Sequence, residues 1–155
     1  MGWITLSQRK QELLWATNEL TYQDTQLSAQ MRQVQRHLAY EQSIFNADKT
    51  SELRAAKEKL DAVRNKRPNS ESSKYDSWKE TYADAQKDYE AKKEDILDYY
   101  DGLETQAETE ATDEESHIQQ QMSTIETQLA AMNAELDSVK EEITNEIEKS
   151  AISFN

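Results

Sequence analysis

The sequence predicts an all-α protein, a long antiparallel coiled-coil hairpin of two helical arms. Glycine occurs only twice and proline only once among 155 residues, whereas a sheet protein needs turn-forming residues every ~8–12 residues. Apolar residues recur at seven-residue intervals through most of the chain, as they do along the seam of a coiled coil. The apolar fraction is 35%, below the typical ~45–50%, which favours thin helical pairs. An elongated four-helix bundle is the alternative.

The first predicted arm covers residues 4–66. One column of its seam is apolar and repeats every seven positions: Leu6, Leu13, Leu20, Leu27 and Val34. The other column is polar in its middle, at Lys10, Thr17 and Asp24. Polar core positions of this kind weaken a coiled coil but can fix its register or the number of helices. Farther along, residues 46–51 either break the helix or continue it through a stutter, and the lack of glycine and proline there favours one continuous helix.

The turn is predicted at residues 67–73. Proline disfavours helix at the residue before Pro68, and the polar residues that follow it are turn and cap formers. The second predicted arm covers residues 74–150, and its first seam positions are Tyr75, Trp78, Tyr82, Ala85, Tyr89, Lys92, Ile96, Tyr99 and Leu103. Residues 104–113 are polar and acidic. The helix either breaks there or continues with an unbroken apolar stripe, and the sequence leaves both alternatives open. We expect one helical domain over residues 1–155.

Two apolar surfaces exceed what a two-helix core can cover. Pairing the arms about Pro68 brings Leu6 opposite Met132 and Leu38 opposite Tyr99, so residues after about 135 overhang the first arm. The overhang carries an apolar stripe made of Leu136, Val139, Ile143, Ile147 and Phe154. Trp15 and Tyr22 form the second surface, on the face opposite the Leu6 column. Exposed apolar stripes mark interaction sites, so we predict a self-association or partner interface at both; in the bundle alternative they face a third helix.

This interface can be challenged by placing charges in the overhang. If the stripe is exposed in the single chain, Leu136→Asp combined with Ile143→Asp should abolish self-association and leave most of the helix content intact. Loss of both together would indicate that the stripe belongs to the core of one molecule.

Net charge is −13 and is unevenly distributed. Residues 1–67 hold 11 Lys/Arg and 8 Asp/Glu, a balance of +3, while residues 68–155 hold 7 and 23, a balance of −16. Nucleic-acid binding calls for a concentrated basic face, and an acidic chain of this kind is not expected to bind nucleic acid. The asymmetry instead favours attraction between the two halves, within one chain or between chains.

No catalytic or metal-binding constellation is recognised. Cysteine is absent and histidine occurs twice, at His37 and His117. Glu114 and His117 have the Glu-x-x-His spacing of di-iron bundles, but those sites need the motif twice, and Val34 stands three residues before His37. No phosphate-binding glycine loop or nucleophile elbow occurs. We therefore predict a non-enzymatic protein without catalytic residues, metal or cofactor.

The compartment is not fixed by the sequence. No apolar run approaches the ~20 residues of a membrane span. Arg9 and Lys10 follow the first residues where a signal peptide would have an apolar stretch, so we expect a cytoplasmic protein or one exported by a leaderless route.

The sequence thus favours a structural protein that self-associates through its helices, as the subunit of a filament, ring or stalk. The alternative function is a helical adaptor or secreted effector that binds a helix of another protein. The expected partner is therefore the chain itself or another helical protein.

Overall fold

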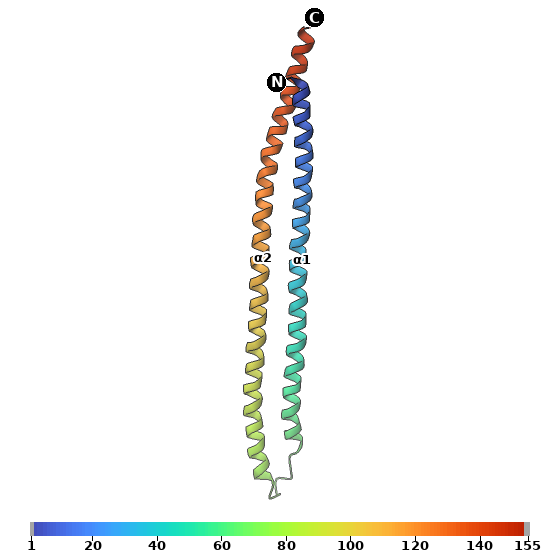
Figure 1. Ribbon diagram of the computed structural model, residues 1–155. Coiled ribbons are helices and arrows are strands. Elements are labelled where there is room, and N and C mark those ends of the chain that lie inside the picture. The colour runs from blue at the N-terminus through green and yellow to red at the C-terminus, as the bar shows by residue number, and fades with distance from the viewer. Residues whose placement is uncertain (1, 154–155) are drawn as a thin grey trace. The chain divides into compact units, whose positions relative to one another are not determined.

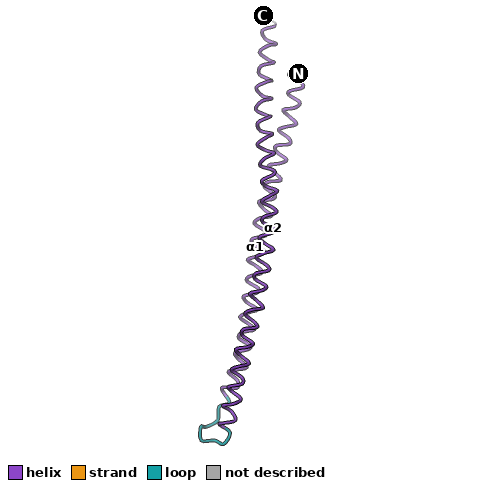
Figure 2. Tube along the Cα trace, turned by 90° about the vertical axis from the view of Figure 1, so that its left-hand side faces the viewer, coloured by secondary structure: helices purple, strands orange, loops and turns teal. Residues whose placement is uncertain are grey.

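The computed structural model describes residues 2–153 and contains two helices in that range, α1 (Trp3–Asn65) and α2 (Tyr75–Ser153), joined by a loop over residues 66–74. Figures 1 and 2 show the two helices and the loop. The all-α hairpin is therefore confirmed, and the four-helix bundle is not adopted because each arm is a single helix. The chain divides into two compact units, which we describe separately: the terminal unit, up to Val34 and from Asp113 onward, and the loop unit, Gln35–Thr112.

Neither of the two segments at which a break was considered interrupts its helix. Thr50 Oγ1 donates a hydrogen bond to the carbonyl of Asn46 (2.8 Å), and Thr109 Oγ1 donates one to the carbonyl of Thr105 (2.8 Å). A threonine that bonds back to the preceding turn satisfies its hydroxyl inside a helix. A threonine hydroxyl bonded in this way is not available to cap a new helix. Residues that commonly start helices are therefore accommodated within α1 and α2.

The loop closes over the C-terminal end of α1. The last turn tightens through bonds from Lys66 N to Val63 O and from Arg67 N to Arg64 O, both 3.2 Å, and Trp78 Nε1 donates a hydrogen bond to Val63 O (2.9 Å). The Val63 carbonyl near the helix end thereby accepts from the Trp78 side chain as well as from Lys66 N, which ties the start of α2 to the end of α1.

Aromatic rings at the start of α2 support this end of the loop unit. Trp78 stacks on Tyr75 and on Tyr82, with ring centroids 5.9 and 5.3 Å apart. The Arg67 guanidinium lies over the rings of Tyr75 and Trp78 at 5.6 and 5.7 Å. These contacts fix the loop against the first turns of α2.

The core of the loop unit leaves the predicted heptad after Tyr89. Lys92 and Tyr99, both assigned to the seam, are exposed, whereas Tyr100 is buried. The half-buried and buried positions run 85, 89, 93 and 96, which is the four-four-three spacing of a stutter. Counting strict sevens therefore placed the wrong tyrosine in the core.

The stutter after Tyr89 places the side chain of Tyr100 in the core of the loop unit. Only 5% of its surface is exposed. Burial raises the pKa of the Tyr100 hydroxyl, and the nearby carboxylate of Glu52 raises it further. The ring fills the core while the hydroxyl reaches the carboxylate of α1, as buried tyrosines commonly require.

The terminal unit is held by an apolar cluster whose buried members are Leu6, Leu13, Leu136 and Val139, with Leu14, Met132 and Ile143 packed against it. The predicted register is wrong here: Leu6 lines a groove with Val139 and Glu142, about one heptad beyond Met132. Two causes add up. The loop is centred after Pro68, and side chains lean toward the N-terminus of their own helix, which in an antiparallel pair shifts each contact toward higher residue numbers.

Gly102 offers a stabilising substitution. It lies inside α2, has no positive φ, and a Cβ built on it meets no atom within 4 Å. Because glycine loses more backbone freedom than alanine on entering a helix, Gly102→Ala should raise the free energy of unfolding by about 0.5–1 kcal/mol, measured by urea unfolding. Gly2→Ala is the control, since Gly2 precedes α1 and should give no comparable gain.

Candidate interaction surface

Three of the predicted interface residues belong to the core of the terminal unit. Leu136 and Val139 are 6% and 7% exposed and pack with Leu6 and Leu13 of α1. Ile143 is half-buried against the same cluster. The overhang expected after residue 135 is therefore covered up to this point by α1 of the same chain, a direct result of the shifted register.

The end of α2 is what remains of the predicted overhang. Figure 1 shows the C-terminal end of α2 extending past the N-terminal end of α1 within the terminal unit. Ile147 is 52% exposed, and Ile152 is 75% exposed. Phe154 lies outside the described residues. The exposed apolar surface at this end is thus shorter than predicted.

Trp15 and Tyr22 lie on the face of α1 that is turned away from the apolar cluster. Their exposed fractions are 72% and 59%, although aromatic side chains of this size normally contribute their area to a core or an interface. Gln26 Nε2 donates a hydrogen bond to the Tyr22 hydroxyl (3.0 Å), which orients the ring on the outer surface. No described residue of α2 covers these two rings.

The two aromatic residues belong to a longer surface that their seven-residue spacing alone does not reveal. We define the outer strip as the exposed positions that alternate at four and three residues along this face: Ile4, Gln8, Gln11, Trp15, Asn18, Tyr22, Thr25 and Ala29. None of them is charged, whereas 32% of the whole chain is charged. Its heptad spacing was present in the sequence, but polar residues between the aromatic ones concealed it. α1 therefore carries two seams, of which α2 occupies one.

The two edges of the outer strip differ in charge. One edge has uncharged residues, Ser7, Leu14, Thr21 and Ser28, and the other carries Glu12 and Glu19. Successive residues of each edge are seven apart, and the second edge continues with the uncharged Thr5 and Gln26, so its two carboxylates lie along the middle of the strip. The strip is consequently bordered by carboxylates on one side alone.

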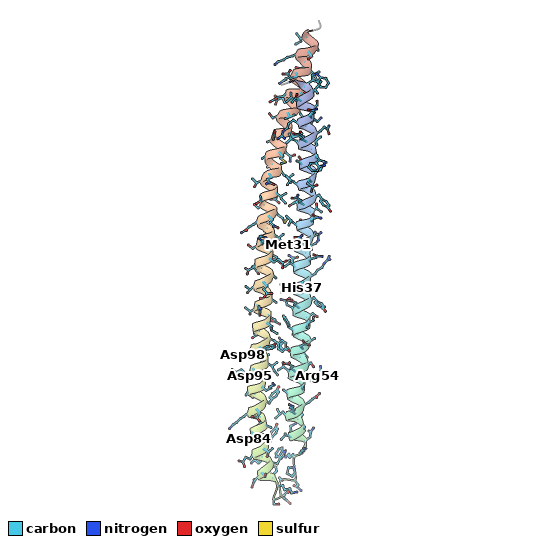
Figure 3. All side chains as sticks on the ribbon, viewed as in Figure 1. Met31, His37, Arg54, Asp84, Asp95 and Asp98 are labelled. Atoms are coloured by element: carbon cyan, nitrogen blue, oxygen red, sulfur yellow. The ribbon has the colours of Figure 1, made fainter. Side chains whose placement is uncertain are left out.

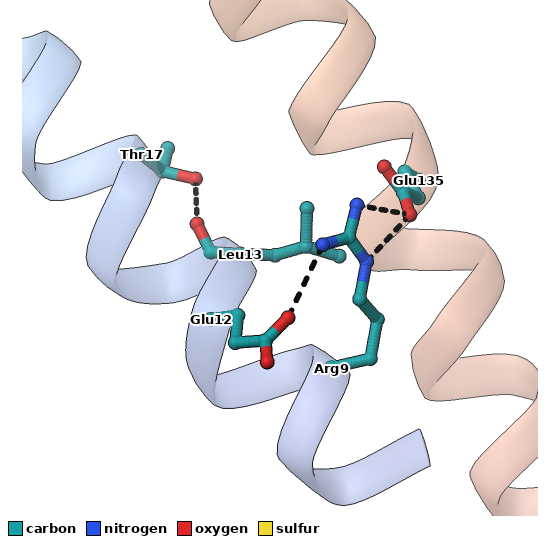
Figure 4. A network of polar contacts seen from close by, with 5 residues as sticks. All are labelled: Arg9, Glu12, Leu13, Thr17 and Glu135. Carbon is teal, nitrogen blue, oxygen red and sulfur yellow. Dashed lines mark hydrogen bonds and ion pairs between the residues drawn. The ribbon is translucent and has the colours of Figure 1, made fainter. Parts of the chain in front are cut away.

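Arg9 connects the carboxylate edge with α2 (Figure 4). Arg9 Nε and Nη2 both lie 2.8 Å from Glu135 Oε1, and Arg9 Nη1 lies 3.3 Å from Glu12 Oε2. The hydrogen bond to Glu135, followed by that to Glu12, raises the pKa of Arg9. The Arg9 and Glu135 side chains are 47% and 46% exposed, so water screens the pair and its contribution to stability is small. Its geometric effect is to hold Arg9 against its own chain.

The polar seam positions of α1 lie inside the terminal unit as predicted. Lys10, Thr17 and Asp24 are half-buried, and Thr17 Oγ1 donates a hydrogen bond to the Leu13 carbonyl. Asp24 Oδ1 is buried without a hydrogen-bond partner. The seam is thus weakest in the middle of the unit, beyond the apolar cluster.

Chemistry-bearing side chains are dispersed over the helices. Among the described residues, no group of three or more His, Cys, Asp or Glu side chains is placed to hold a metal ion. His37, which is labelled on α1 in Figure 3, has its Nε2 atom 2.8 Å from Glu41 Oε1, one turn along the helix. His117 Nε2 lies 3.4 Å from Gln121 Nε2. Within residues 2–153, neither helix has a stretch apolar enough to cross a membrane.

Comparison with known proteins gives no match: no family model, no curated protein and no solved structure matches this chain. The functional argument therefore rests on the surfaces described above.

Proposed function

We propose that this protein is a structural subunit that self-associates through the outer strip of α1. The observation that carries the proposal is the position of Trp15 and Tyr22, which are largely exposed on a helical face that α2 does not reach. A solvated face needs no aromatic side chains, and burial of one such side chain is favourable by about 1.5–3 kcal/mol. A contact that covers both rings in each copy has a large apolar driving force.

The surface area of the chain supports the same proposal. The accessible surface is 11495 Å², whereas a compact monomer of 18.0 kDa would expose roughly 8,000 Å². A two-helix hairpin leaves most of each helix in water. Association would bury part of this excess, and the subunit of a filament, ring or stalk would do so repeatedly.

Light scattering coupled to size exclusion tests the proposal. The wild-type chain should show a mass that rises with concentration above 18.0 kDa, and Trp15→Ser combined with Tyr22→Ser should shift association to at least 100-fold higher concentration, because removal of two aromatic side chains from each copy forfeits several kcal/mol.

The control is Tyr40→Ser combined with Tyr99→Ser, which removes two side chains of similar exposure, 64% and 61%, from the loop unit. This variant should associate like the wild type. A constant mass of 18.0 kDa at every concentration would refute self-association and favour an adaptor that binds a helix of another protein.

A further inference from the structure

We infer that the outer strip is occupied by the outer strip of a second copy, with the two α1 helices parallel and in register. The inference rests on the proposed self-association and adds the pairing surface and its orientation. The strip has the alternating four- and three-residue spacing that lets two helices interlock along a common seam. It ends where charged residues return on the same face, at Arg32 and Arg36.

The absence of charge on the strip points to a second copy. The chain carries a net charge of −13, so two copies repel one another overall. Charged side chains are also the usual means by which an interface selects a different partner. From Ile4 to Ala29 the strip has no charged side chain that could repel a second copy or select a different partner. It is a surface on which two acidic molecules can meet without direct like-charge contacts.

The area to be buried requires the whole strip. Two aromatic side chains in each copy bury on the order of 600 Å² in total, at about 150 Å² each. A specific interface begins at about 1,200 Å², so the aromatic rings supply roughly half of it. The remainder must come from the other positions of the strip, above all Ile4 and Ala29 near its ends. Pairing along the full strip is therefore part of the inference.

The edges of the strip determine the orientation. In an antiparallel pair, each edge lies against the same edge of the second copy, which brings Glu12 of one chain near Glu19 of the other at two symmetric places. Like charges facing each other across a helical seam destabilise it. In a parallel pair, the carboxylate edge lies against the uncharged edge that contains Leu14 and Thr21. Parallel pairing avoids the repulsion, whereas antiparallel pairing creates it twice.

Disulfide trapping distinguishes these arrangements, and the absence of native cysteine makes single-cysteine variants unambiguous. Gln8→Cys and Thr25→Cys place thiols near the two ends of the strip. A disulfide needs Cα atoms about 4.4–6.8 Å apart, so each variant should form a covalent dimer with itself in the parallel pair. Glu58→Cys, at an exposed position of α1 in the loop unit, is the control for random collision and should form at least ten-fold less dimer.

Any other cross-linking result would contradict parallel, in-register pairing, and each such result has a distinct meaning. Disulfides that form only when the Gln8→Cys and Thr25→Cys proteins are mixed would show antiparallel pairing. Failure of both variants to cross-link, while light scattering still shows oligomers, would place self-association on another surface and leave the proposed function standing. Cross-linking of Glu58→Cys to the same extent would show collision rather than pairing. A wild-type chain that stays monomeric would refute both proposals.

Discussion

Leu136→Asp is expected to unfold the terminal unit rather than to act on association alone. Leu136 is 6% exposed and packs with Leu6, Leu13 and Val139, so the substitution removes a buried apolar side chain and places a carboxylate in the cluster. The loss in the free energy of unfolding should exceed about 4 kcal/mol. Circular dichroism should show reduced helix content, and amide exchange should locate the loss of protection in the terminal unit.

Ile147→Asp is the matched control, since Ile147 lies on the same helix but is 52% exposed. Its effect on stability should stay within about 1 kcal/mol. This expectation replaces the one drawn from the sequence, in which aspartate at Leu136 and Ile143 would spare the helices. Retention of full helix content and amide protection in Leu136→Asp would contradict the packing of the cluster.

Among alanine substitutions in the N-terminal half of α1, Leu13→Ala should cause the largest loss in the free energy of unfolding. Leu13 is 2% exposed, and removal of a fully buried leucine side chain lowers the free energy of unfolding by about 3 kcal/mol or more. Leu20→Ala, in the same heptad column but half-buried, should lose roughly half as much because fewer contacts disappear. Urea unfolding followed by circular dichroism measures both, and equal losses would contradict the difference in packing between these two positions.

Most of the fold could be predicted because it depends on local and periodic features. The lack of glycine and proline, together with Pro68 as the main interruption, sufficed for two long helices and one reversal. The continuous helix through residues 46–51 followed from the absence of glycine and proline in that segment. The register could not be obtained in the same way, because it depends on the path of the loop and on the lean of side chains, which residue counting does not capture. The resulting shift of about one heptad moved Leu136 and Val139 from a supposed overhang into the core.

The candidate surface was predicted in part. Trp15 and Tyr22 were recognised by their seven-residue spacing and by their position away from the Leu6 column, and both are exposed in the structure. Residues such as Gln8 and Asn18 were missed because neither is apolar. They matter because they are uncharged, which keeps the whole outer strip free of charge. Tyr99 was misplaced for the opposite reason: a strict heptad favoured it, although the stutter after Tyr89 presents the next tyrosine to the core.

The tightest packing in the terminal unit lies close to the beginning of the chain. Chain ends and the outer turns of helices normally open first, but Leu6 and Leu13 are each only 2% exposed, and the polar seam positions Thr17 and Asp24 come after them. Local opening should instead begin at the polar seam positions Thr17 and Asp24. Brief separations of the two helices there would leave the N-terminal end of α1 packed against α2.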